Sequence, residues 1–548
     1  MVRRALNGTR HRAGTTAALS RSSRGRIAAF TIVLLFVLTV RLASLDTSLA
    51  SFVNLLTAGP QALKAATLPT PTGLATANGG CAGGNEKTNV SVTWTASAEL
   101  DANGSPLING YTVLRSTSSG GSYSSVGSTG IAASFTDINP SGAETPQVYV
   151  GNNGEAVKTV HTVNTSTNVG TSIPTGIIGT EPNGVAVNPE GTKIVVAEGA
   201  SHQVQIITVA TRTVAATVAV PEVAGIKSRP DAVAVTPNGL TAYVVDGANK
   251  RVYPLTIATG TLGTAITVNT QGDPGAILVT PNGEKVYVAN FSAHNVSVIS
   301  TATNTVTATV TIGAGETGKP IALAATPNSA HVYVADQGNA RVDDIATASN
   351  TVTKEITVGS MVDANVASGG DPNILAITPD GSKLYAASYT GHGVADIATA
   401  TDTVTATITL FESATANPNA LALTPNGCQL YVHDHAHNVV DVITVSNDAV
   451  PAHPAVGATG DPTGMSSTPD STKVYVANQA ASTFSVIATA TNTVSATLAE
   501  ATVGKAPYAV LATPSPYFYK LQAGHGGWQS PLTAAVSYPV GWKQGGWQ

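Results

Sequence analysis

Alternating apolar and polar residues recur through the middle of the chain in groups of four short runs. The fullest copy begins at Asp273 and contains runs over 275–279, 285–289, 295–299 and 305–310. Alternation with a period of two over such short lengths is typical of half-buried β-strands. Turn residues separate the runs, and Val, Ile, Thr and Ala fill them. Each copy therefore predicts a four-stranded antiparallel meander.

The copies follow one another at steps of 44 to 52 residues. This period, with four strands in each copy, is typical of a β-propeller. Each copy opens with a proline, at Pro182, Pro230, Pro274, Pro320, Pro372, Pro418, Pro462 and Pro507. A strand built around Tyr-Val occurs at Tyr149, Val195, Tyr243, Tyr287, Tyr333, Tyr385, Tyr431 and Tyr475.

The two series are out of phase at the ends of the array. The first Tyr-Val strand, at Tyr149, has no proline strand before it, and the last proline strand, from Pro507 to Pro514, has no Tyr-Val strand after it. We therefore predict that one blade is split between the two ends of the array. Pairing of these strands would close the ring and leave no open sheet edge. The prediction is eight blades, seven intact and one split.

Turn residues support this strand order. The first two strands of a blade are joined by Pro-Asn-Gly or a close variant, as at Pro281-Asn282-Gly283. Proline sets φ for the first turn position, and glycine accepts the left-handed conformation at the end. Short polar loops such as Thr303-Asn304 join the last two strands.

These motifs resemble the YVTN family of β-propeller repeats, which occur in surface-layer and other exported proteins. Tyr287-Val-Ala-Asn290, Tyr333-Val-Ala-Asp336 and Tyr475-Val-Ala-Asn478 stand where that family carries Tyr-Val-Thr-Asn. The resemblance covers about two-thirds of the chain and implies a propeller with a role outside the cell. Relatives commonly have seven blades, so seven is the alternative count. Propellers host many unrelated activities, so the resemblance implies no particular chemistry.

The segments on either side of the array, 68–140 and 516–540, alternate in the same way. Joined, they resemble a fibronectin type III domain, with Trp94 in its second strand and Tyr517 or Tyr519 as the tyrosine corner. We therefore expect a β-propeller over 146–514 inserted into this β-sandwich, followed by a tail over 541–548. The expected fold class is all-β.

The N-terminus has a different character. Seven arginines precede an apolar run over 27–40, and no acidic residue comes before Asp46. An Arg-rich start followed by a short apolar run is typical of a secretory signal. We therefore read 1–50 as a signal peptide, with a signal anchor through residues 27–40 as the alternative, and 51–67 as a tether. The expected location is secreted or on the cell surface, with membrane contact only through this N-terminal segment.

Composition excludes some partners. Charged residues make up 11% of the chain and the net charge is −5. Nucleic-acid binding needs clustered Lys and Arg, so we expect no nucleic-acid partner. The only cysteines, Cys81 and Cys428, exclude a disulfide framework, and we expect no bridge between them.

Histidines gather at His433-Asp434-His435-Ala436-His437. This set has the residue types of a Zn²⁺ or Cu²⁺ site. However, His437 aligns with His202, His294 and His392 at the turn between the second and third strands of other blades. We therefore expect an outward, solvated turn residue there. We predict no metal site.

The residue before each opening proline is the best candidate for a site. These residues should surround one mouth of the central channel, where a polar ligand or a peptide would bind. Their alternative role is that of ordinary turn residues. They are Glu181, Arg229, Asp273, Lys319, Asp371, Asn417, Asp461 and Ala506.

No catalytic motif is present: the sequence contains no Gly-x-Ser-x-Gly, no His-Glu-x-x-His and no phosphate-binding glycine loop. We predict no catalytic residues and no cofactor. The expected function is a non-enzymatic exported protein whose propeller binds a protein or a cell-envelope carbohydrate. The alternative is a lactonase-like hydrolase or a lyase with its site at the channel mouth.

Overall fold

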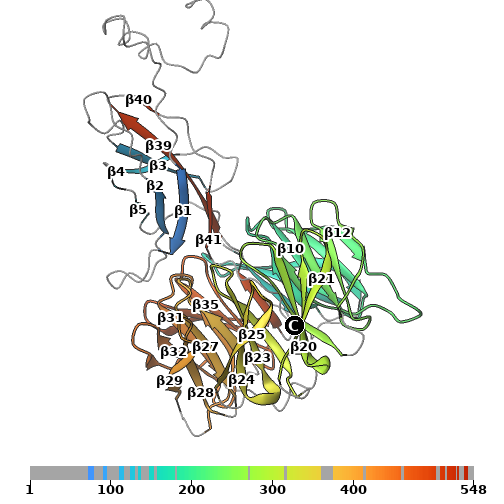
Figure 1. Ribbon diagram of the computed structural model, residues 1–548. Coiled ribbons are helices and arrows are strands. Elements are labelled where there is room, and N and C mark those ends of the chain that lie inside the picture. Colours follow the sequence, from blue (N-terminus) through green and yellow to red (C-terminus); the bar gives the residue numbers. More distant parts are fainter. Residues whose placement is uncertain are drawn as a thin grey trace, which may run out of the picture. The chain divides into compact units, whose positions relative to one another are not determined.

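The structure is a computed structural model (Figure 1). It describes residues 72–78, 90–95, 110–116, 124–129, 132, 134–137, 147–152, 157–178, 182–268, 272–313, 317–358, 374–389, 391–411, 415–457, 462–500, 507–512, 515–525, 528–529 and 536–540. The predicted signal or anchor, the tether and the C-terminal tail all lie outside these residues.

Eight antiparallel sheets form the blades of a β-propeller. The first four in the intact series are β9 (Pro182–Val187), β10 (Lys193–Glu198), β11 (Gln203–Thr208) and β12 (Thr213–Ala219); β13 (Pro230–Val235), β14 (Thr241–Asp246), β15 (Arg251–Thr256), β16 (Thr261–Leu262) and β17 (Ile266–Thr267); β18 (Pro274–Val279), β19 (Lys285–Asn290), β20 (Asn295–Ser300) and β21 (Thr305–Thr311); and β22 (Pro320–Ala325), β23 (His331–Asp336), β24 (Arg341–Ala346) and β25 (Thr351–Thr357).

The remaining blades follow the same plan. They are β26 (Leu375–Ile377), β27 (Lys383–Ser388), β28 (Gly393–Ala398) and β29 (Thr403–Thr409); β30 (Pro418–Leu423), β31 (Gln429–Asp434), β32 (Val439–Thr444) and β33 (Ala449–Ala452); β34 (Pro462–Ser467), β35 (Lys473–Asn478), β36 (Thr483–Ala488) and β37 (Thr493–Leu498); and β38 (Pro507–Ala512), β6 (Gln147–Asn152), β7 (Val157–Asn164) and β8 (Gly170–Ile178). Short 3₁₀ turns, η2 (Phe291–Ala293) and η3 (Gln337–Asn339), follow two of the second strands.

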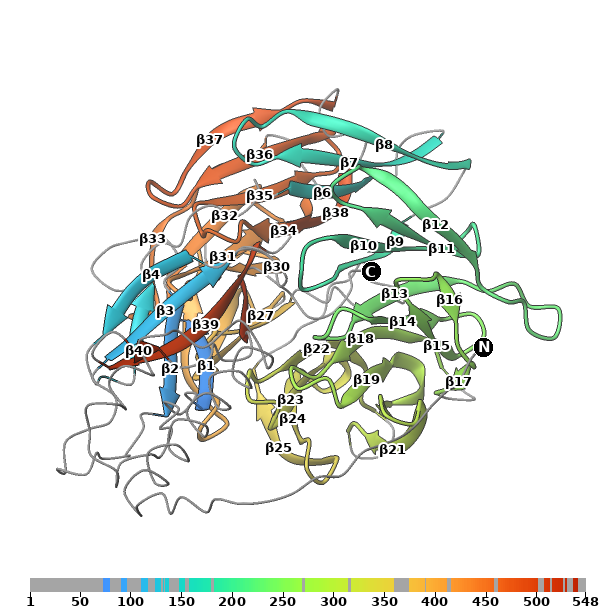
Figure 2. The same cartoon turned by 90° about the horizontal axis from the view of Figure 1, so that it is seen from above.

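The last of these sheets is the predicted split blade. Strand β38 pairs antiparallel with β6, joining Pro507 to Asn152 and Ala512 to Val148. The first strands of successive blades contact one another in order, and β38 contacts both β34 and β9, so the ring is continuous (Figure 2). The count of eight blades and the closure by strand pairing are both confirmed.

A single repeated topology gives the ring two different ends. Each first strand starts at one end, which we call the rim end, and the turn between second and third strands lies there too. The other end, the latch end, carries the turns between first and second strands and between third and fourth strands. At the latch end the predicted turn glycines take positive φ, for example 74° at Gly283.

Tyrosines connect the blades at the latch end. In six of the blades, the hydroxyl of the Tyr in the repeated Tyr-Val strand donates to an Asn or Asp side chain in the hairpin of the next blade. Each acceptor residue has φ between 50° and 56°, a left-handed conformation that Asn and Asp tolerate better than most residues. The pairs are Tyr243–Asn304 (2.7 Å), Tyr287–Asn350 (3.0 Å), Tyr333–Asp402 (2.7 Å), Tyr385–Asp448 (3.1 Å), Tyr431–Asn492 (2.7 Å) and Tyr475–Asn168 (2.9 Å).

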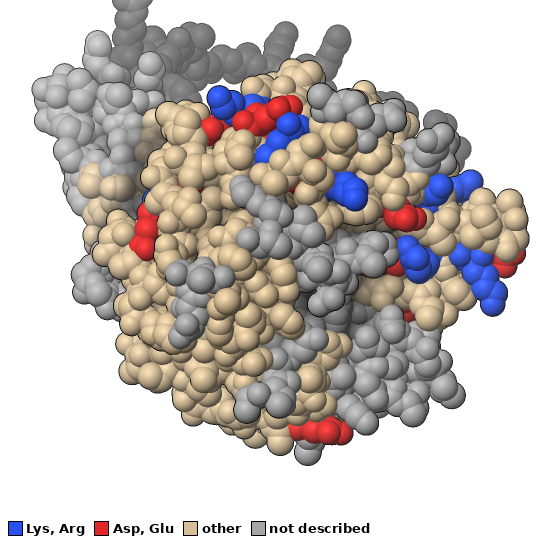
Figure 3. Space-filling view, turned by 90° about the horizontal axis from the view of Figure 1, so that it is seen from below, with Lys and Arg blue, Asp and Glu red and all other residues tan. Residues whose placement is uncertain are grey.

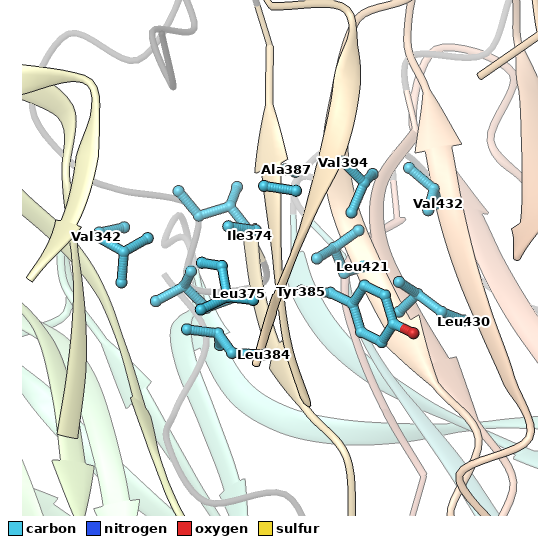
Figure 4. Packing of buried hydrophobic residues seen from close by; sticks show 14 of the residues in the cluster. Val342, Ile374, Leu375, Leu384, Tyr385, Ala387, Val394, Leu421, Leu430 and Val432 are labelled. Atoms are coloured by element: carbon cyan, nitrogen blue, oxygen red, sulfur yellow. The ribbon is translucent and has the colours of Figure 1, made fainter. Parts of the chain in front are cut away.

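The hydrophobic core fills the spaces between neighbouring blades. Figure 4 shows Tyr385 beside Leu421 and Leu430 of the following blade, with Leu375 and Leu384 nearby. The second strands are almost completely buried, whereas the outer strands alternate between exposed and half-buried residues. Burial therefore falls from the second strand to the edge of each blade, which explains why the period-two pattern is clearest in the last run of each repeat.

Two further sheets come from the segments that flank the array. One has the order β1 (Thr72–Asn78), β2 (Val90–Thr95) and β5 (Ser134–Asp137). The other has the order β4 (Ser124–Thr129), β3 (Gly110–Ser116), β39 (Ser515–His525) and β40 (Trp528–Gln529), with β41 (Val536–Val540) also paired to β39. Strand β3 precedes the propeller and β39 follows it, and they pair over seven residues. The assignment to a fibronectin type III-like domain stays a prediction.

The expectation about the cysteines is wrong. Cys428 is disulfide-bonded, although the low number of cysteines led us to expect no bridge. The chain contains one other cysteine, Cys81, which lies outside the described residues. Spacing along the sequence carries no information on a single long-range pair, because two cysteines far apart in the chain meet only through the fold.

Within the described part of the chain, no helix is long and apolar enough to span a membrane.

Candidate functional site at the rim of the propeller

The predicted site residues lie where the first strands begin. Arg229, Asp273, Lys319 and Asn417 each precede the first residue of a first strand, so they lie at the rim end. Arg229 and Lys319 are exposed, and Asp273 and Asn417 are half-buried, while the proline that follows each is buried. The other predicted rim residues, Glu181, Asp371, Asp461 and Ala506, lie outside the described residues.

Buried carboxylates hold the backbone of this rim. The amide N–H groups of Arg229, Lys319 and Asn417 each donate over 2.8 Å to the Oδ1 atom of an Asp that ends the neighbouring second strand. These acceptors are Asp246, Asp336 and Asp434, and all three are fully buried. A carboxylate that accepts from a backbone N–H forms a charge-assisted bond, which is stronger than a neutral one. The rim residues thus have a fixed backbone, and the side chains of Arg229 and Lys319 reach solvent.

This anchor position was not predicted as part of the site. It corresponds to the final Asn or Asp of the Tyr-Val-Ala-Asn motif, so the sequence did contain a signal for it. The same position is occupied by Glu198, Asp246, Asn290, Asp336, Ser388, Asp434 and Asn478.

The recurring histidines also hold the rim, which corrects the expectation that they are solvated turn residues. His202, His294 and His392 have left-handed backbones, with φ of 57° to 60°. The Nδ1 atom of each lies 2.5 to 2.6 Å from the carbonyl oxygen of the residue just before a rim residue, as in the pair His294–Gly318. Each imidazole therefore connects the turn of one blade to the rim loop of the next.

The alignment of His437 with these residues is wrong by one position. Strand β32 begins at Val439, and the left-handed residue before it is Asn438, with φ of 53°. His437 lies one residue earlier and its Nδ1 atom is 2.6 Å from Asp434 Oδ2. A left-handed turn position is set by backbone geometry, which residue type alone does not locate.

The other two histidines of the cluster are placed differently. His433 is fully buried, its Nδ1 atom lies 2.5 Å from Asn419 Oδ1, and burial lowers its pKa to about 3. The ring of His435 lies 6.4 Å from that of His433. Among the residues that the structure describes, no group of three or more His, Cys, Asp or Glu side chains is arranged to hold a metal ion.

A polar network forms at the rim where the β9–β12 and β13–β17 sheets adjoin. Arg229 Nε donates to both carboxylate oxygens of Asp231 over 2.9 Å, and Asn183 Nδ2 donates to Asp231 Oδ1 over 3.1 Å. Burial raises the pKa of Asp231 above its usual range, and the nearby Arg229 opposes this shift. The side chain of Arg229 remains 51% exposed. The network therefore presents a guanidinium to solvent from a fixed support.

Glycines make room for this network. A Cβ atom on Gly247 would lie 2.0 Å from Asp231 Oδ2, and one on Gly199 would lie 2.3 Å from Asn183 Nδ2. Next to Gly199, burial raises the pKa of Glu198 to about 7.

Charged residues are sparse on the surface. On the face seen in Figure 3, uncharged residues predominate among those described.

Comparisons with known proteins bear on the fold. No known protein family matches the sequence, and no curated protein does. Among solved structures, the chain resembles the dihydro-heme d1 dehydrogenase NirN in complex with DHE, at 12% identity over 67% of this chain and 75% of that one, with a TM-score of 0.53. It also resembles the hydrazine synthase of Kuenenia stuttgartiensis, at 20% identity over 56% and 96% of the two chains, with a TM-score of 0.40.

A third similar structure is the β-propeller domain of Cps50 (Swd1) from Myceliophteria thermophila, at 12% identity over 55% and 94% of the two chains, with a TM-score of 0.42. At such low identities a structural likeness shows the fold alone. The neighbours have diverse roles, and the chain itself is a β-propeller.

Proposed function

We propose that this chain is an exported, non-enzymatic protein whose propeller binds a partner at the rim end. The observation that carries the proposal is that Arg229 and Lys319 combine a fixed backbone with an exposed, charged side chain. Their amide N–H groups are held by buried carboxylates, while their side chains are exposed. A binding site gains affinity when its groups are ordered before the ligand arrives.

Three features support export. The Arg-rich N-terminus followed by the apolar run over 27–40 is typical of a secretory signal. The disulfide at Cys428 is of the kind that persists in oxidising compartments. The resemblance to YVTN repeats and to fibronectin type III modules implies the same location. The partner class that follows is an envelope protein or a cell-envelope carbohydrate.

The test is binding of the full chain to isolated cell-envelope polysaccharide and to solubilised envelope protein. We expect R229S/K319S to weaken binding at least about tenfold, because two exposed cations at the rim are lost. The matched control is R212S/K354S, which removes the same two charges away from the rim end. Equal losses in both variants would show non-specific attraction to charge and would count against a rim site.

A second function, hydrolysis or elimination at the same rim, has one observation in its favour. The carboxyl of Asp231 has a raised pKa and is held between Arg229 and Asn183, as a general acid or base requires. Turnover of a lactone or uronate panel by the wild type, abolished in Asp231→Asn with its melting temperature retained, would favour this function. Binding that persists in Asp231→Asn without any turnover in the wild type would favour the first proposal.

A further inference from the structure

Three aromatic side chains meet at the rim end, where the β26–β29 and β30–β33 blades adjoin. Phe411 lies in the loop after β29, His437 in the turn between β31 and β32, and His453 just after β33. The ring of Phe411 stacks on that of His453, with centroids 4.3 Å apart and planes inclined by 21°. It meets the ring of His437 edge to face, with centroids 6.5 Å apart. We call these three residues the aromatic cluster.

The repeat usually has other residue types at these positions. The second residue after the fourth strand is Gly313 after β21 and Gly359 after β25, whereas Phe411 takes this place after β29. His437 precedes a left-handed turn residue. In other blades the same place holds a small or amide residue: Ser201, Ala293, Asn339, Gly391 or Ala481.

His453 stands in place of a threonine. Strand β33 ends at Ala452, which pairs with Val442, so His453 follows opposite Asp441. In four other blades the residue at this place is Thr217, Thr309, Thr407 or Thr497. Blades without these rings form the same strands, so the fold does not require the aromatic cluster.

Buried carboxylates hold the cluster in place. The N–H of Phe411 donates to Asp441 Oδ1 over 3.2 Å, and His453 Nδ1 lies 3.8 Å from the same oxygen. His437 lies between two partners, with Nδ1 2.6 Å from Asp434 Oδ2 and Nε2 3.1 Å from the hydroxyl of Thr415. Both aspartates are fully buried. Rings that are ordered before a ligand arrives lose little freedom when it binds.

Part of the cluster is open to solvent. Phe411 is 39% exposed, and it is the only exposed Phe, Tyr or Trp among the residues whose burial is described. The side chain of His453 is 40% exposed. A single exposed apolar residue needs no explanation. This ring, however, is fixed by its backbone and joined to two imidazoles, as in a built binding surface.

The charges around the cluster favour an uncharged ligand. Between residues 374 and 457 the sequence contains one lysine and no arginine. That lysine, Lys383, begins β27 and so lies at the latch end. The carboxylates beside the cluster, Asp434 and Asp441, are buried. The surface therefore offers neither a Lys or Arg for a phosphate nor an exposed carboxylate for an organic cation.

A sugar ring has the matching chemistry. The faces of a pyranose carry C–H groups, which are attracted to the negative face of an aromatic ring. Its edge carries hydroxyls, with which an exposed imidazole such as that of His453 can exchange hydrogen bonds. Proline-rich peptides, in contrast, bind in grooves between aromatic side chains. The rings of Phe411 and His453 are stacked on each other and leave no such groove between them.

We propose that the aromatic cluster of Phe411, His437 and His453 binds a ring of a neutral saccharide. This site is separate from Arg229 and Lys319, which belong to other blades. The choice of a cell-envelope glycan as the natural source of the saccharide rests on the proposed function, whereas binding of a sugar ring to the cluster does not.

The test is saturation-transfer NMR of the full chain with cellotetraose, chitotetraose and mannotetraose, followed by measurement of Kd. We expect transfer to the ring C–H protons of at least one sugar, and Phe411→Ala should raise its Kd at least about tenfold. Leu240→Ala, which removes an exposed apolar side chain at the latch end, is the matched control and should leave Kd unchanged. Absence of transfer to all three sugars, or equal weakening in both variants, would overturn the proposal.

Further variants distinguish stacking from simple apolar contact. Phe411→Trp keeps an aromatic face and should bind nearly as well as the wild type, whereas Phe411→Leu should bind about tenfold more weakly. Phe411→Leu also keeps most of the side-chain bulk, so it replaces the alanine variant if that variant does not fold. Equal affinities of the Trp and Leu variants would refute stacking.

His453→Thr restores the residue that four other blades have at this position, so it should fold. It should weaken sugar binding about threefold, because Phe411 loses the ring on which it stacks. An unchanged Kd would exclude His453 from the site. Transfer to a proline decapeptide and to none of the sugars would overturn the saccharide as ligand.

The same sugars separate this site from the proposed function. R229S/K319S should bind them as the wild type does, because both cations lie in other blades. Loss of sugar binding in that variant would count against a separate site. If the wild type binds no envelope fraction, the proposed function fails, while a sugar signal that Phe411→Ala abolishes still supports the aromatic cluster.

Discussion

The latch end and the rim end of the blades are built from the same strands, yet they differ in how uniform their chemistry is. At the latch end, six tyrosine hydroxyls make the same bond to an Asn or Asp of the next blade. At the rim end, the buried residue that closes the second strand is Glu, Asp, Asn or Ser in different blades. Uniform contacts between blades maintain one ring geometry, while the rim is free to vary.

The variation has a physical basis. A latch bond spans two blades and connects them, although the β9–β12 blade has Val195 in place of the tyrosine. A rim anchor satisfies N–H groups within its own blade, as Asp336 does for Lys319 and Gly338. Candidate functional residues are therefore expected among the varied positions, on a support made by the repeated ones.

The largest effect on stability should come from opening the ring, because one blade then loses its contacts at the rim end and at the latch end together. A fragment over 146–504 lacks β38 and so exposes the edges of β6 and the core of the neighbouring blades. Compared with a 146–514 fragment, we expect it to aggregate and to lose its cooperative thermal transition. Light scattering and calorimetry would measure this. Equal stability and a monomeric state in both fragments would contradict closure by β38.

At the rim end, Asp336→Ala should cost about 3–5 kcal/mol of unfolding free energy, because it leaves Arg341 buried without one of its partners. Asp336→Asn is the matched control, since Asn already occupies this position in the β18–β21 blade. It should cost less. Urea unfolding followed by circular dichroism of the backbone would compare the two variants. Similar losses of unfolding free energy in both would mean that the negative charge is essential at this anchor.

Buried acids near the rim should make the whole ring less stable as pH rises. Burial raises the pKa of Glu198 from 4.5 to about 7 and that of Asp343 to about 7. A raised carboxyl pKa in the folded state gives stability that is present at low pH and is lost as pH rises through the folded value. The melting temperature should therefore fall between pH 5 and pH 8.

Glu198→Gln should reduce this fall, because glutamine does not ionise. A melting temperature that rises from pH 5 to pH 8 in the wild type would contradict the assignment of a protonated Glu198 to the folded state.

At the latch end, Tyr287→Phe should cost about 1 kcal/mol, the usual contribution of one hydrogen bond. The loss is limited because Asn350 Oδ1 also accepts from Lys285 Nζ over 3.0 Å. Tyr431→Phe provides a repeat of the same test in another blade. Chemical denaturation of both variants should give matching losses, and a large difference between them would show that the latches are not equivalent.

The smallest effect is expected from Lys319→Ser. The side chain of Lys319 is exposed, and its backbone N–H, which the variant keeps, makes the bond to Asp336. The melting temperature should change by less than about 1 °C, since exposed charges contribute little to stability. A large fall would assign Lys319 to the fold and would weaken its role in binding.

Much of the fold was open to prediction from the sequence. The period of the strands, the out-of-phase ends at Tyr149 and Pro507, and the turn glycines together predicted eight blades with one split. These features are local and repeated, and they depend on backbone conformation. Each copy of the repeat therefore predicts the same blade independently. The position of the described rim residues Arg229, Lys319 and Asn417 followed from the same repetition.

The contacts that determine the candidate site were not open to prediction in this way. His294 bonds a carbonyl 24 residues further along the chain, and Cys428 has a covalent partner that no local pattern indicates. Whether a buried acid lies beside Arg341 or beside His453 depends on which side chains meet across strands in register. The sequence alone determined the architecture because periodicity and turns act between near neighbours. The tertiary structure alone decided which polar groups meet at the rim, because burial and charge act between residues that only the ring brings together.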